Sequence, residues 1–288
     1  METSELLKKV RKVEIKTRGL SNQLFSGEYH TAFKGKGMTF SEVREYQPGD
    51  DIRSIDWNVS ARFNNTYIKV FEEEREMTVM LLVDISASGE FGTQKQLKHE
   101  LITELCAVLA FSAIQNNDKI GVIFFTDKIE KFIPPQKGKS HILRIIRDLI
   151  EFKPEHKKTN IKLALRYLTN VIKKRSIAFV ISDFIDNNDF IDALKIANKK
   201  HDLVALRIFD KREMELPDMG LVKFMDSETG ALVWIDSSVK DVRAHFYASA
   251  KKRAASLKEM FNKCGVDSAE INTAESYIKP LMNLFKRR

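Results

Sequence analysis

Apolar and polar residues alternate in blocks along the middle of the chain. Four short runs are almost continuously apolar, which is the pattern of strands buried on both faces: 78–83, 120–126, 176–182 and 202–209. The segments between them repeat apolar residues at helical spacing and predict amphipathic helices: 94–115, 140–152, 161–174 and 190–200. Strands that alternate with helices in this way predict an α/β fold, with a doubly wound, mainly parallel sheet that has helices on both faces.

The regions on either side of this alternation differ from it. Residues 1–74 combine turn signals with short stretches of alternating apolar residues, such as 55–59, and predict a small β-rich segment. Residues 75–265 form the predicted α/β domain, which closes with a β-hairpin and a long amphipathic helix over 239–264. We expect the partly apolar C-terminal tail, 266–288, to dock on this domain.

Composition narrows the class of protein. The chain has 48 lysines and arginines against 40 acidic residues, a net charge of +8. This excess is spread along the chain without an aromatic-interleaved basic motif, so nucleic-acid binding is the weaker alternative. No apolar run reaches the ~20 residues that a membrane span needs. Residues 1–19 lack the apolar core of a secretory signal, and there are only two cysteines. We therefore expect a cytoplasmic protein without a membrane span.

Short polar side chains follow the first predicted strand. Asp84, Ser86 and Ser88 stand at alternate positions directly after it. Their oxygen atoms are ligands that suit Mg²⁺, or alternatively Mn²⁺ or Ca²⁺, with water in the remaining positions. The other interpretation is that Asp84 or Ser86 caps the next helix.

Two more oxygen-bearing residues are predicted at the same edge of the sheet. Asp183 follows a later buried strand, and Thr159 precedes a helix. Because the carboxyl ends of parallel strands converge, we expect these side chains to meet Asp84 although they are distant in sequence. Thr159 has a second interpretation, as the N-cap of its helix. The metal hypothesis also requires that no lysine or arginine of the chain itself neutralises the two carboxylates.

The order Asp-Xaa-Ser-Xaa-Ser, then Thr, then Asp, resembles the metal-ion-dependent adhesion site of von Willebrand factor A domains. The resemblance covers about residues 75–210 and implies the fold of those domains. It implies that these residues bind the metal: Asp84, Ser86, Ser88, Thr159 and Asp183. It also implies that a protein partner supplies a carboxylate that completes the metal coordination.

A second resemblance lies upstream of the sheet. Residues 35–62 contain VREYQPGDDIRSIDW and resemble the hallmark of the family catalogued as domain of unknown function 58, in its soluble bacterial members. Members of that family often occur beside MoxR-type AAA+ ATPases, which implies an adaptor or assembly role with such an ATPase. This chain departs from the pattern at Gly89, where many relatives have methionine, and in the lysine-rich loop before Thr159.

Three further residues are candidates for contact with a partner. Glu90 either approaches the metal and changes its affinity or points to solvent. Arg44 and Arg53 form either a partner surface or an internal network of salt bridges and turns within the β-rich segment. The sequence leaves these alternatives open.

The residues favour a metal-dependent protein-interaction module over an enzyme. A metal-assisted phosphoester hydrolase is the alternative, and it needs a nucleophile or general base beside the metal. The six histidines show no HxH or HExxH spacing, and the chain has no P-loop or GxSxG motif. His156, close to Thr159 in sequence, is the best candidate base. The basic surface favours the approach of an acidic partner.

Overall fold

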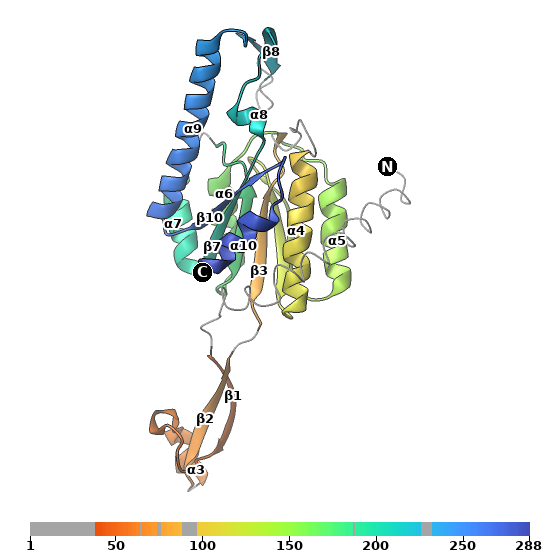
Figure 1. Cartoon of the computed structure of the whole chain (residues 1–288). Helices are drawn as coiled ribbons and strands as arrows, with labels where there is room; N and C mark the ends of the chain where they lie inside the picture. The colour runs from red at the N-terminus through yellow and green to blue at the C-terminus, as the bar shows by residue number, and fades with distance from the viewer. Residues whose placement is uncertain (1–37, 64, 74–75, 88–96, 187, 226–231) are drawn as a thin grey trace. The chain divides into compact units, whose positions relative to one another are not determined.

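Two compact units make up the chain, a small one within residues 34–77 and a larger one from residue 78 onward. The computed structural model describes the following residues (Figure 1): 38–63, 65–73, 76–87, 97–186, 188–225 and 232–288. Within them, no helix is both long enough and apolar enough to cross a lipid bilayer.

A six-stranded sheet forms the centre of the larger unit, in the order β10-β7-β6-β3-β4-β5. Its strands are β3 (Thr78–Asp84), β4 (Lys119–Phe125), β5 (Ile129–Gln136), β6 (Ile177–Ser182), β7 (Asp202–Phe209) and β10 (Asp267–Asn272). Neighbouring strands are parallel except for β5, which is antiparallel to β4. The continuous apolar runs of β3, β4 and β6 are buried along nearly their whole length. The predicted α/β fold is confirmed.

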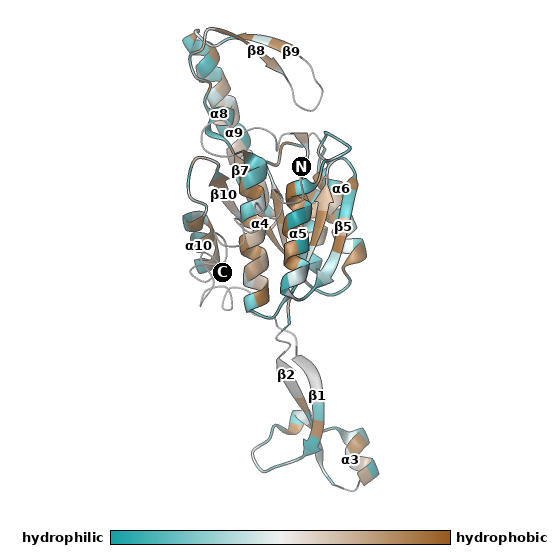
Figure 2. Cartoon of the chain, turned by 90° about the vertical axis from the view of Figure 1, so that its right-hand side faces the viewer, coloured by the Kyte–Doolittle hydropathy of each residue, from teal (hydrophilic) through white to brown (hydrophobic). Residues whose placement is uncertain are grey.

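Helices cover both faces of this sheet. They are α4 (Lys98–Gln115), α5 (Lys139–Glu151), α6 (Ile161–Val171), α7 (Ile191–Lys200), α8 (Lys211–Met214), α9 (Lys240–Lys263) and α10 (Ile278–Lys286). α4 and α5 lie on one face, and α6 and α7 lie on the other (Figure 1, Figure 2). On the second face, Leu82 of β3, Leu165 of α6 and Leu194 of α7 belong to one fully buried apolar cluster. This packing fixes the strand ends that carry the candidate site.

A hairpin of β8 (Leu221–Met225) and β9 (Leu232–Asp236) precedes α9 and is separate from the main sheet. Figure 2 shows it at the N-terminal end of α9, beyond the edge of the sheet. Trp234 in this hairpin is 61% exposed, and the ammonium of Lys223 lies 5.5 Å from the centre of its ring. The hairpin therefore presents aromatic and basic side chains to its surroundings.

The C-terminal residues add a strand that the sequence analysis did not assign. β10 lies within the predicted tail and pairs in parallel with β7 at the edge of the sheet. Its sequence, DSAEIN, is mostly polar, and only Ala269 and Ile271 are buried. The apolar signal of this strand is therefore weak. α10 follows and buries Leu281, Leu284 and Phe285.

The small unit is a strand pair with a helical insertion. Its elements are β1 (Met38–Glu45), η1 (Ile52–Ser54), α3 (Trp57–Phe63) and β2 (Tyr67–Glu73). β1 and β2 pair antiparallel, as expected of a β-rich segment. The strand predicted over 55–59 is wrong, because α3 begins at Trp57. Asp56 caps this helix: its Oδ1 atom accepts a hydrogen bond from the N–H of Asn58 at 3.0 Å.

The topology of the sheet has a switch point beside β3. β4 and β5 lie to one side of β3, whereas β6, β7 and β10 lie to the other. β3 and β6 are parallel neighbours, with Val83 beside Ile181, so their carboxyl ends lie together. Ligands of open α/β sheets bind at the carboxyl ends of strands at such a point.

Replacing Gly121 with alanine is expected to destabilise the larger unit by about 3 kcal/mol, because the core has no room for the added methyl group. A Cβ atom at this position in β4 would lie 2.8 Å from the carbonyl oxygen of Ile133 and 2.9 Å from the backbone nitrogen of Pro135. Urea unfolding followed by circular dichroism measures the loss. Gly265→Asn is the matched control, because its φ of 65° suits asparagine and a Cβ atom there would make only an ordinary contact, 3.6 Å from Nδ2 of Asn198. Equal losses in both variants would contradict the prediction.

Candidate metal centre

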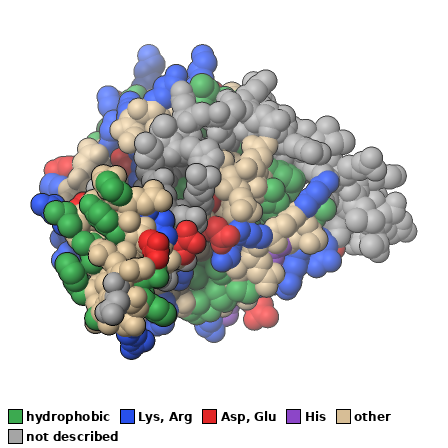
Figure 3. All heavy atoms as spheres, turned by 90° about the horizontal axis from the view of Figure 1, so that it is seen from below, with side chains coloured by type: hydrophobic (Ala, Val, Ile, Leu, Met, Phe, Trp, Pro, Cys, Tyr) green, Lys and Arg blue, Asp and Glu red, His purple; other side chains and the backbone are tan. Residues whose placement is uncertain are grey.

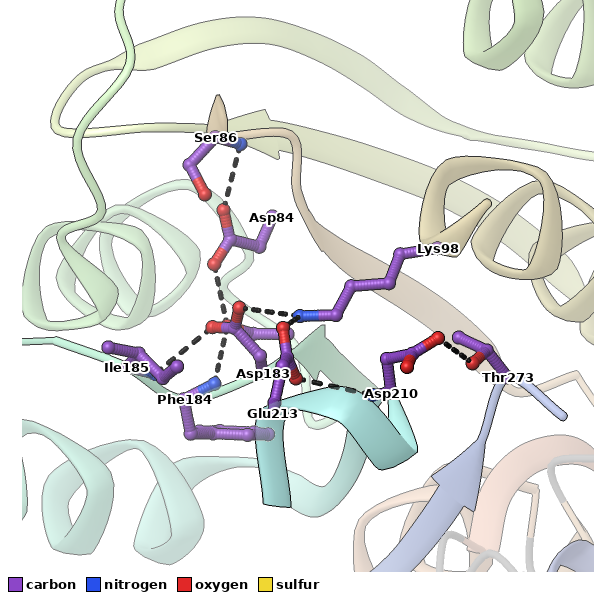
Figure 4. Close-up of polar contacts among 10 residues, drawn as sticks. Asp84, Ser86, Lys98, Asp183, Phe184, Ile185, Asp210, Glu213 and Thr273 are labelled. Carbon is purple, nitrogen blue, oxygen red and sulfur yellow. Dashed lines mark hydrogen bonds and ion pairs between the residues drawn. The ribbon is translucent and has the colours of Figure 1, made fainter. Parts of the chain in front are cut away.

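Two buried carboxylates lie together at the carboxyl ends of β3 and β6. Asp84 is the last residue of β3, and Asp183 directly follows β6; they are 4% and 6% exposed. Because the two strands are parallel neighbours, these side chains approach each other although they are distant in sequence (Figure 4). The structure thus brings together the two carboxylates that were predicted to bind a metal.

Hydrogen bonds hold Asp84, but no cation of the described part of the chain neutralises it. Its Oδ1 atom accepts from the N–H of Ser86 at 3.0 Å, and its Oδ2 atom accepts from the hydroxyl of Ser182 at 2.6 Å. Burial, reinforced by the negative charge of Asp183, raises the pKa of Asp84 to about 7. A buried carboxylate in these surroundings would be stabilised by a bound cation.

A lysine that the sequence analysis missed neutralises the other carboxylate. Lys98, at the start of α4, is 1% exposed, and its Nζ atom lies 3.1 Å from Oδ2 of Asp183. The same ammonium pairs with Oε1 of Glu213 on α8 (Figure 4). Burial acts to lower the pKa of Lys98, but the two carboxylates outweigh it and raise that pKa. The condition that no lysine neutralises the carboxylates therefore holds for Asp84 and fails for Asp183.

The sequence contained a signal for Lys98. It stands three and seven residues before Leu101 and Leu105, which are buried in α4, so helical periodicity places it on the buried face. A lysine on such a face needs an acidic partner. Glu213 belongs to a capping box at the start of α8, in which its Oε2 atom accepts from the N–H of Asp210 at 3.2 Å. α8 follows β7, so Glu213 approaches the same edge of the sheet.

Thr159 has a buried hydroxyl without a hydrogen-bond partner among the described residues. The interpretation of Thr159 as a helix cap is wrong, because Asn160 caps α6 by accepting from the N–H of Leu163 at 2.9 Å. The loop before Thr159 reaches the end of β3, where the N–H of Ala87 donates to the carbonyl of Lys157 at 3.1 Å. An unpartnered buried hydroxyl beside this strand end is the kind of group that a metal ion would satisfy.

Backbone strain follows Asp183. Phe184 has a φ of 58°, in the left-handed region that non-glycine residues rarely adopt. Its N–H donates to the hydroxyl of Ser182 at 2.9 Å, and the N–H of Ile185 donates to Oδ1 of Asp183 at 3.1 Å. The buried ring of Phe184 contacts Phe261 of α9 edge-on, with ring centres 5.0 Å apart. Packing and hydrogen bonds thus maintain a strained turn, a feature that concentrates at functional sites.

The donor set fits a hard divalent cation on the Asp84 side of the centre. Asp84, Ser86 and Thr159 offer a carboxylate and two hydroxyls, whereas Asp183 already has a cation in Lys98. With Glu213, three carboxylates and one ammonium leave two negative charges, which one divalent cation would balance. The described residues contain no group of three or more His, Cys, Asp or Glu arranged to hold a metal alone, so hydroxyl and water ligands are required.

Ser88 and Glu90, the remaining candidates beside the centre, lie outside the described residues. The two candidates in the small unit have different surroundings. Arg44 forms a two-pronged ion pair with Asp50, at 2.7 and 2.8 Å, and so belongs to the internal network. The side chain of Arg53 is exposed and has no ion pair within the described residues.

Exposed hydrophobic side chains accompany Arg53. Ile52, Trp57 and Phe63 are 70%, 71% and 66% exposed. Hydrophobic groups of this kind are visible at the surface in Figure 3. An exposed arginine next to large apolar side chains is the composition of an interaction surface.

Comparison with known families places most of the chain in one of them. Residues 42–256 match the model described as protein of unknown function DUF58. An uncharacterized protein of Mycobacterium bovis is 25% identical over the whole of this chain and 91% of its own length. The uncharacterized protein YeaD of Bacillus subtilis is 30% identical over 38% of this chain and 25% of its own length.

A solved structure shares the fold of the larger unit. An aerotolerance-related membrane protein from Bacteroides fragilis aligns over 74% of this chain and 100% of its own, with a TM-score of 0.50 and 16% identity. The VWA domain of SpRpn10 aligns over 74% of this chain and 95% of its own, with a TM-score of 0.39 and 10% identity. The chain belongs to the DUF58 family, and its larger unit shares its α/β fold with the Bacteroides fragilis protein.

Proposed function

We propose that this chain is a metal-dependent protein-interaction module, in which a divalent cation at Asp84, Ser86 and Thr159 binds a carboxylate of a protein partner. The observation that carries the proposal is the coincidence of two buried groups: the carboxylate of Asp84, which no cation among the described residues neutralises, and the hydroxyl of Thr159, which has no hydrogen-bond partner among them. The family and the fold favour an interaction module. The metal would supply positive charge that makes a partner's carboxylate a specific ligand.

The chain's own residues have distinct roles in this proposal. Asp84 provides the negative charge that balances the cation, and the N–H of Ser86 orients its carboxylate. By resemblance, Ser88 would add a third hydroxyl ligand, and Glu90 is proposed, from its place in the sequence alone, as a contact for the partner. Asp183 contributes from the far side, where Lys98 shares its Oδ2 atom. Mg²⁺ is the first candidate, and Mn²⁺ or Ca²⁺ are alternatives with the same preference for oxygen ligands.

A MoxR-type AAA+ ATPase is the partner that we propose to test first, on the strength of the family resemblance. The chain would then act in the cytoplasm as an adaptor or assembly factor for that ATPase. Its net charge of +8 favours an acidic partner surface. Arg53 and the exposed apolar side chains of the same small unit are a second proposed contact for the partner.

Replacing Thr159 with alanine is expected to weaken Mg²⁺ binding about tenfold, because one oxygen ligand is lost. Partner binding in Mg²⁺ should weaken with it. Isothermal titration calorimetry measures the metal affinity, and surface plasmon resonance measures binding to a MoxR-type ATPase of the same organism in Mg²⁺ or EDTA.

Thr169→Ala is the matched control for this substitution. Thr169 lies on α6, the helix that follows Thr159, and its hydroxyl donates only to the carbonyl of Arg166 at 2.8 Å. Its loss should leave metal and partner binding unchanged. Wild-type protein that binds neither Mg²⁺ nor Mn²⁺, or that binds its partner equally well in EDTA, would remove the proposed function.

A metal-assisted phosphoester hydrolase is the second candidate, and one contact favours it. Nδ1 of His156 lies 3.6 Å from Oδ1 of Asp127. Asp127 is in the loop that follows β4, and His156 is in the loop that precedes Thr159. The distance is longer than a hydrogen bond, but an aspartate beside a histidine is one element of a general base. Mg²⁺-dependent hydrolysis of p-nitrophenyl phosphate that disappears in His156→Ala would establish this function.

A further inference from the structure

A cavity of about 440 Å³ opens directly beside the candidate metal centre. It lies between the turn after β6, the start of α7, α8 and the C-terminal half of α9, and Asp183 and Glu213 belong to its wall. This volume is within the ~300–1,000 Å³ of typical ligand sites. The cavity therefore shares a wall with the centre and has room for a side chain or small ligand.

Most of the cavity wall is apolar. Its apolar side chains come from four elements and include Phe184, Phe190, Met214, Leu257 and Met260. Ile185 stands in the same wall and is 52% exposed, although it directly follows the buried turn at Asp183. An exposed isoleucine at the mouth of an apolar cavity would lose contact with water if the cavity were filled.

The acidic residues of the wall already have partners. Lys98 pairs with both Asp183 and Glu213. Asp186 accepts hydrogen bonds through both carboxylate oxygens, from the N–H of Ile161 at 2.8 Å and from Asn188 at 2.8 Å. Asp186 therefore has little capacity left for a ligand, and Asp183 and Glu213 share the charge of Lys98.

The basic residues of the wall retain capacity. Arg207 is 9% exposed, and its Nη1 atom pairs with Glu270 at 2.8 Å, but its Nε atom is buried without a hydrogen-bond partner among the described residues. Arg253 of α9 is exposed at the same cavity. α9 carries seven lysines and arginines against two acidic residues, an excess of five in a chain whose net charge is +8. The helix that borders the cavity therefore favours an acidic ligand.

We propose that this cavity receives a large apolar side chain from the same partner segment whose carboxylate reaches the metal centre. The recognised segment is then an acidic stretch of protein with an aliphatic or aromatic residue within a few positions of its metal-binding aspartate or glutamate. This inference rests on the proposed function and names the chemistry of the partner. The shared wall at Asp183 and Glu213 supports one continuous binding surface, with α9 attracting the acids that flank the apolar residue.

A peptide selection tests this inference. The full chain is immobilised in Mg²⁺ and used to select from a random peptide library, with elution by EDTA. We expect the eluted peptides to share an acidic residue with Phe, Leu, Ile, Met or Trp close to it. Ser256→Trp, which places a large ring at the cavity wall, should weaken the selected peptide about tenfold and leave Mg²⁺ affinity unchanged.

Two further variants separate the possible outcomes. Ala255→Trp is the matched control, because Ala255 is an exposed neighbour on α9 that does not line the cavity, and it should bind the peptide like wild type. Arg253→Glu should also weaken binding of the peptide, because it replaces a positive charge at the cavity with a negative one. Peptides eluted by EDTA that lack an apolar residue, or that bind equally to Ser256→Trp, overturn the inference and leave the proposed function intact. Peptides with the apolar residue that stay bound in EDTA, are released only by a later acid wash and respond to Ser256→Trp would show an apolar site in the cavity, and would overturn both the shared metal-binding segment and the metal-dependent function.

Discussion

Replacing Lys98 with methionine is expected to tighten Mg²⁺ binding at the centre by about tenfold or more. Methionine keeps the length of the side chain and removes its charge, so Oδ2 of Asp183 loses its ion pair and becomes available to the metal. Without metal the same change should destabilise the protein by about 3–5 kcal/mol, because the buried carboxylate of Asp183 and the partly buried carboxylate of Glu213 lose their cation. Isothermal titration calorimetry measures the affinity, and thermal unfolding in EDTA followed by circular dichroism measures the stability.

Two other variants control for charge and for loss of an ion pair. Lys131→Met removes a lysine that pairs with Asp148 at 2.8 Å on β5 and α5, and it should leave Mg²⁺ binding unchanged. Lys98→Arg keeps the positive charge and should not tighten Mg²⁺ binding. A Lys98→Met protein that is folded and binds Mg²⁺ no more tightly than wild type would show that Lys98 does not compete with the metal for Asp183. A variant that is unfolded in EDTA and folded in excess Mg²⁺ would support that competition.

Replacing Asp84 with asparagine is expected to stabilise the metal-free protein at pH 8 and to abolish its stabilisation by Mg²⁺. The folded protein holds the pKa of Asp84 at about 7, above its ordinary value, so it binds a proton that the unfolded chain has released. The stability that this bound proton contributes to the folded protein is complete below about pH 4 and is lost as the pH rises through 7. Asparagine keeps the acceptor for the N–H of Ser86 and carries no charge to bury.

The expected signature is therefore a crossing of stabilities. In EDTA the melting temperatures of wild type and Asp84→Asn should be similar at pH 5, and the variant should be higher at pH 8 by on the order of 5 °C. Mg²⁺ should raise the melting temperature of wild type at pH 8 and leave the variant unchanged. Asp148→Asn is the control, since it removes a buried acid that already has a lysine partner. An equal response of both proteins to Mg²⁺ at pH 8 would contradict the role given to Asp84.

The spacing of apolar residues was sufficient to predict most strands of the sheet. Where the prediction from this spacing failed, the failure has a physical cause. β3, β4 and β6 are buried on both faces, so each is a nearly continuous apolar run that no other element explains. β10 is an edge strand that buries only alternate residues, and its polar sequence resembles a loop. α3 was mistaken for a strand because a cap at Asp56 outweighs the alternation of the residues that follow.

The candidate site shows the same limit. Asp84 and Asp183 could be placed from the sequence because each stands at the end of a buried strand, and parallel strands bring such ends together. Lys98 and Glu213 reach the site from α4 and α8, and their pairing depends on how two helices pack against the sheet. The pattern of apolar and polar residues within one segment does not indicate how two helices pack against the sheet. A lysine on the buried face of a predicted helix nevertheless predicts an acidic partner elsewhere in the chain.

The surface position of both indole rings has a consequence for spectroscopy. Trp57 and Trp234, the only tryptophans of the chain, are 71% and 61% exposed. Their fluorescence in the folded protein should already be that of indole in water, so it would report poorly on melting of the core. A blue shift on adding another protein would instead locate contact at the small unit or at the hairpin, and single Trp→Phe exchanges would tell the two apart.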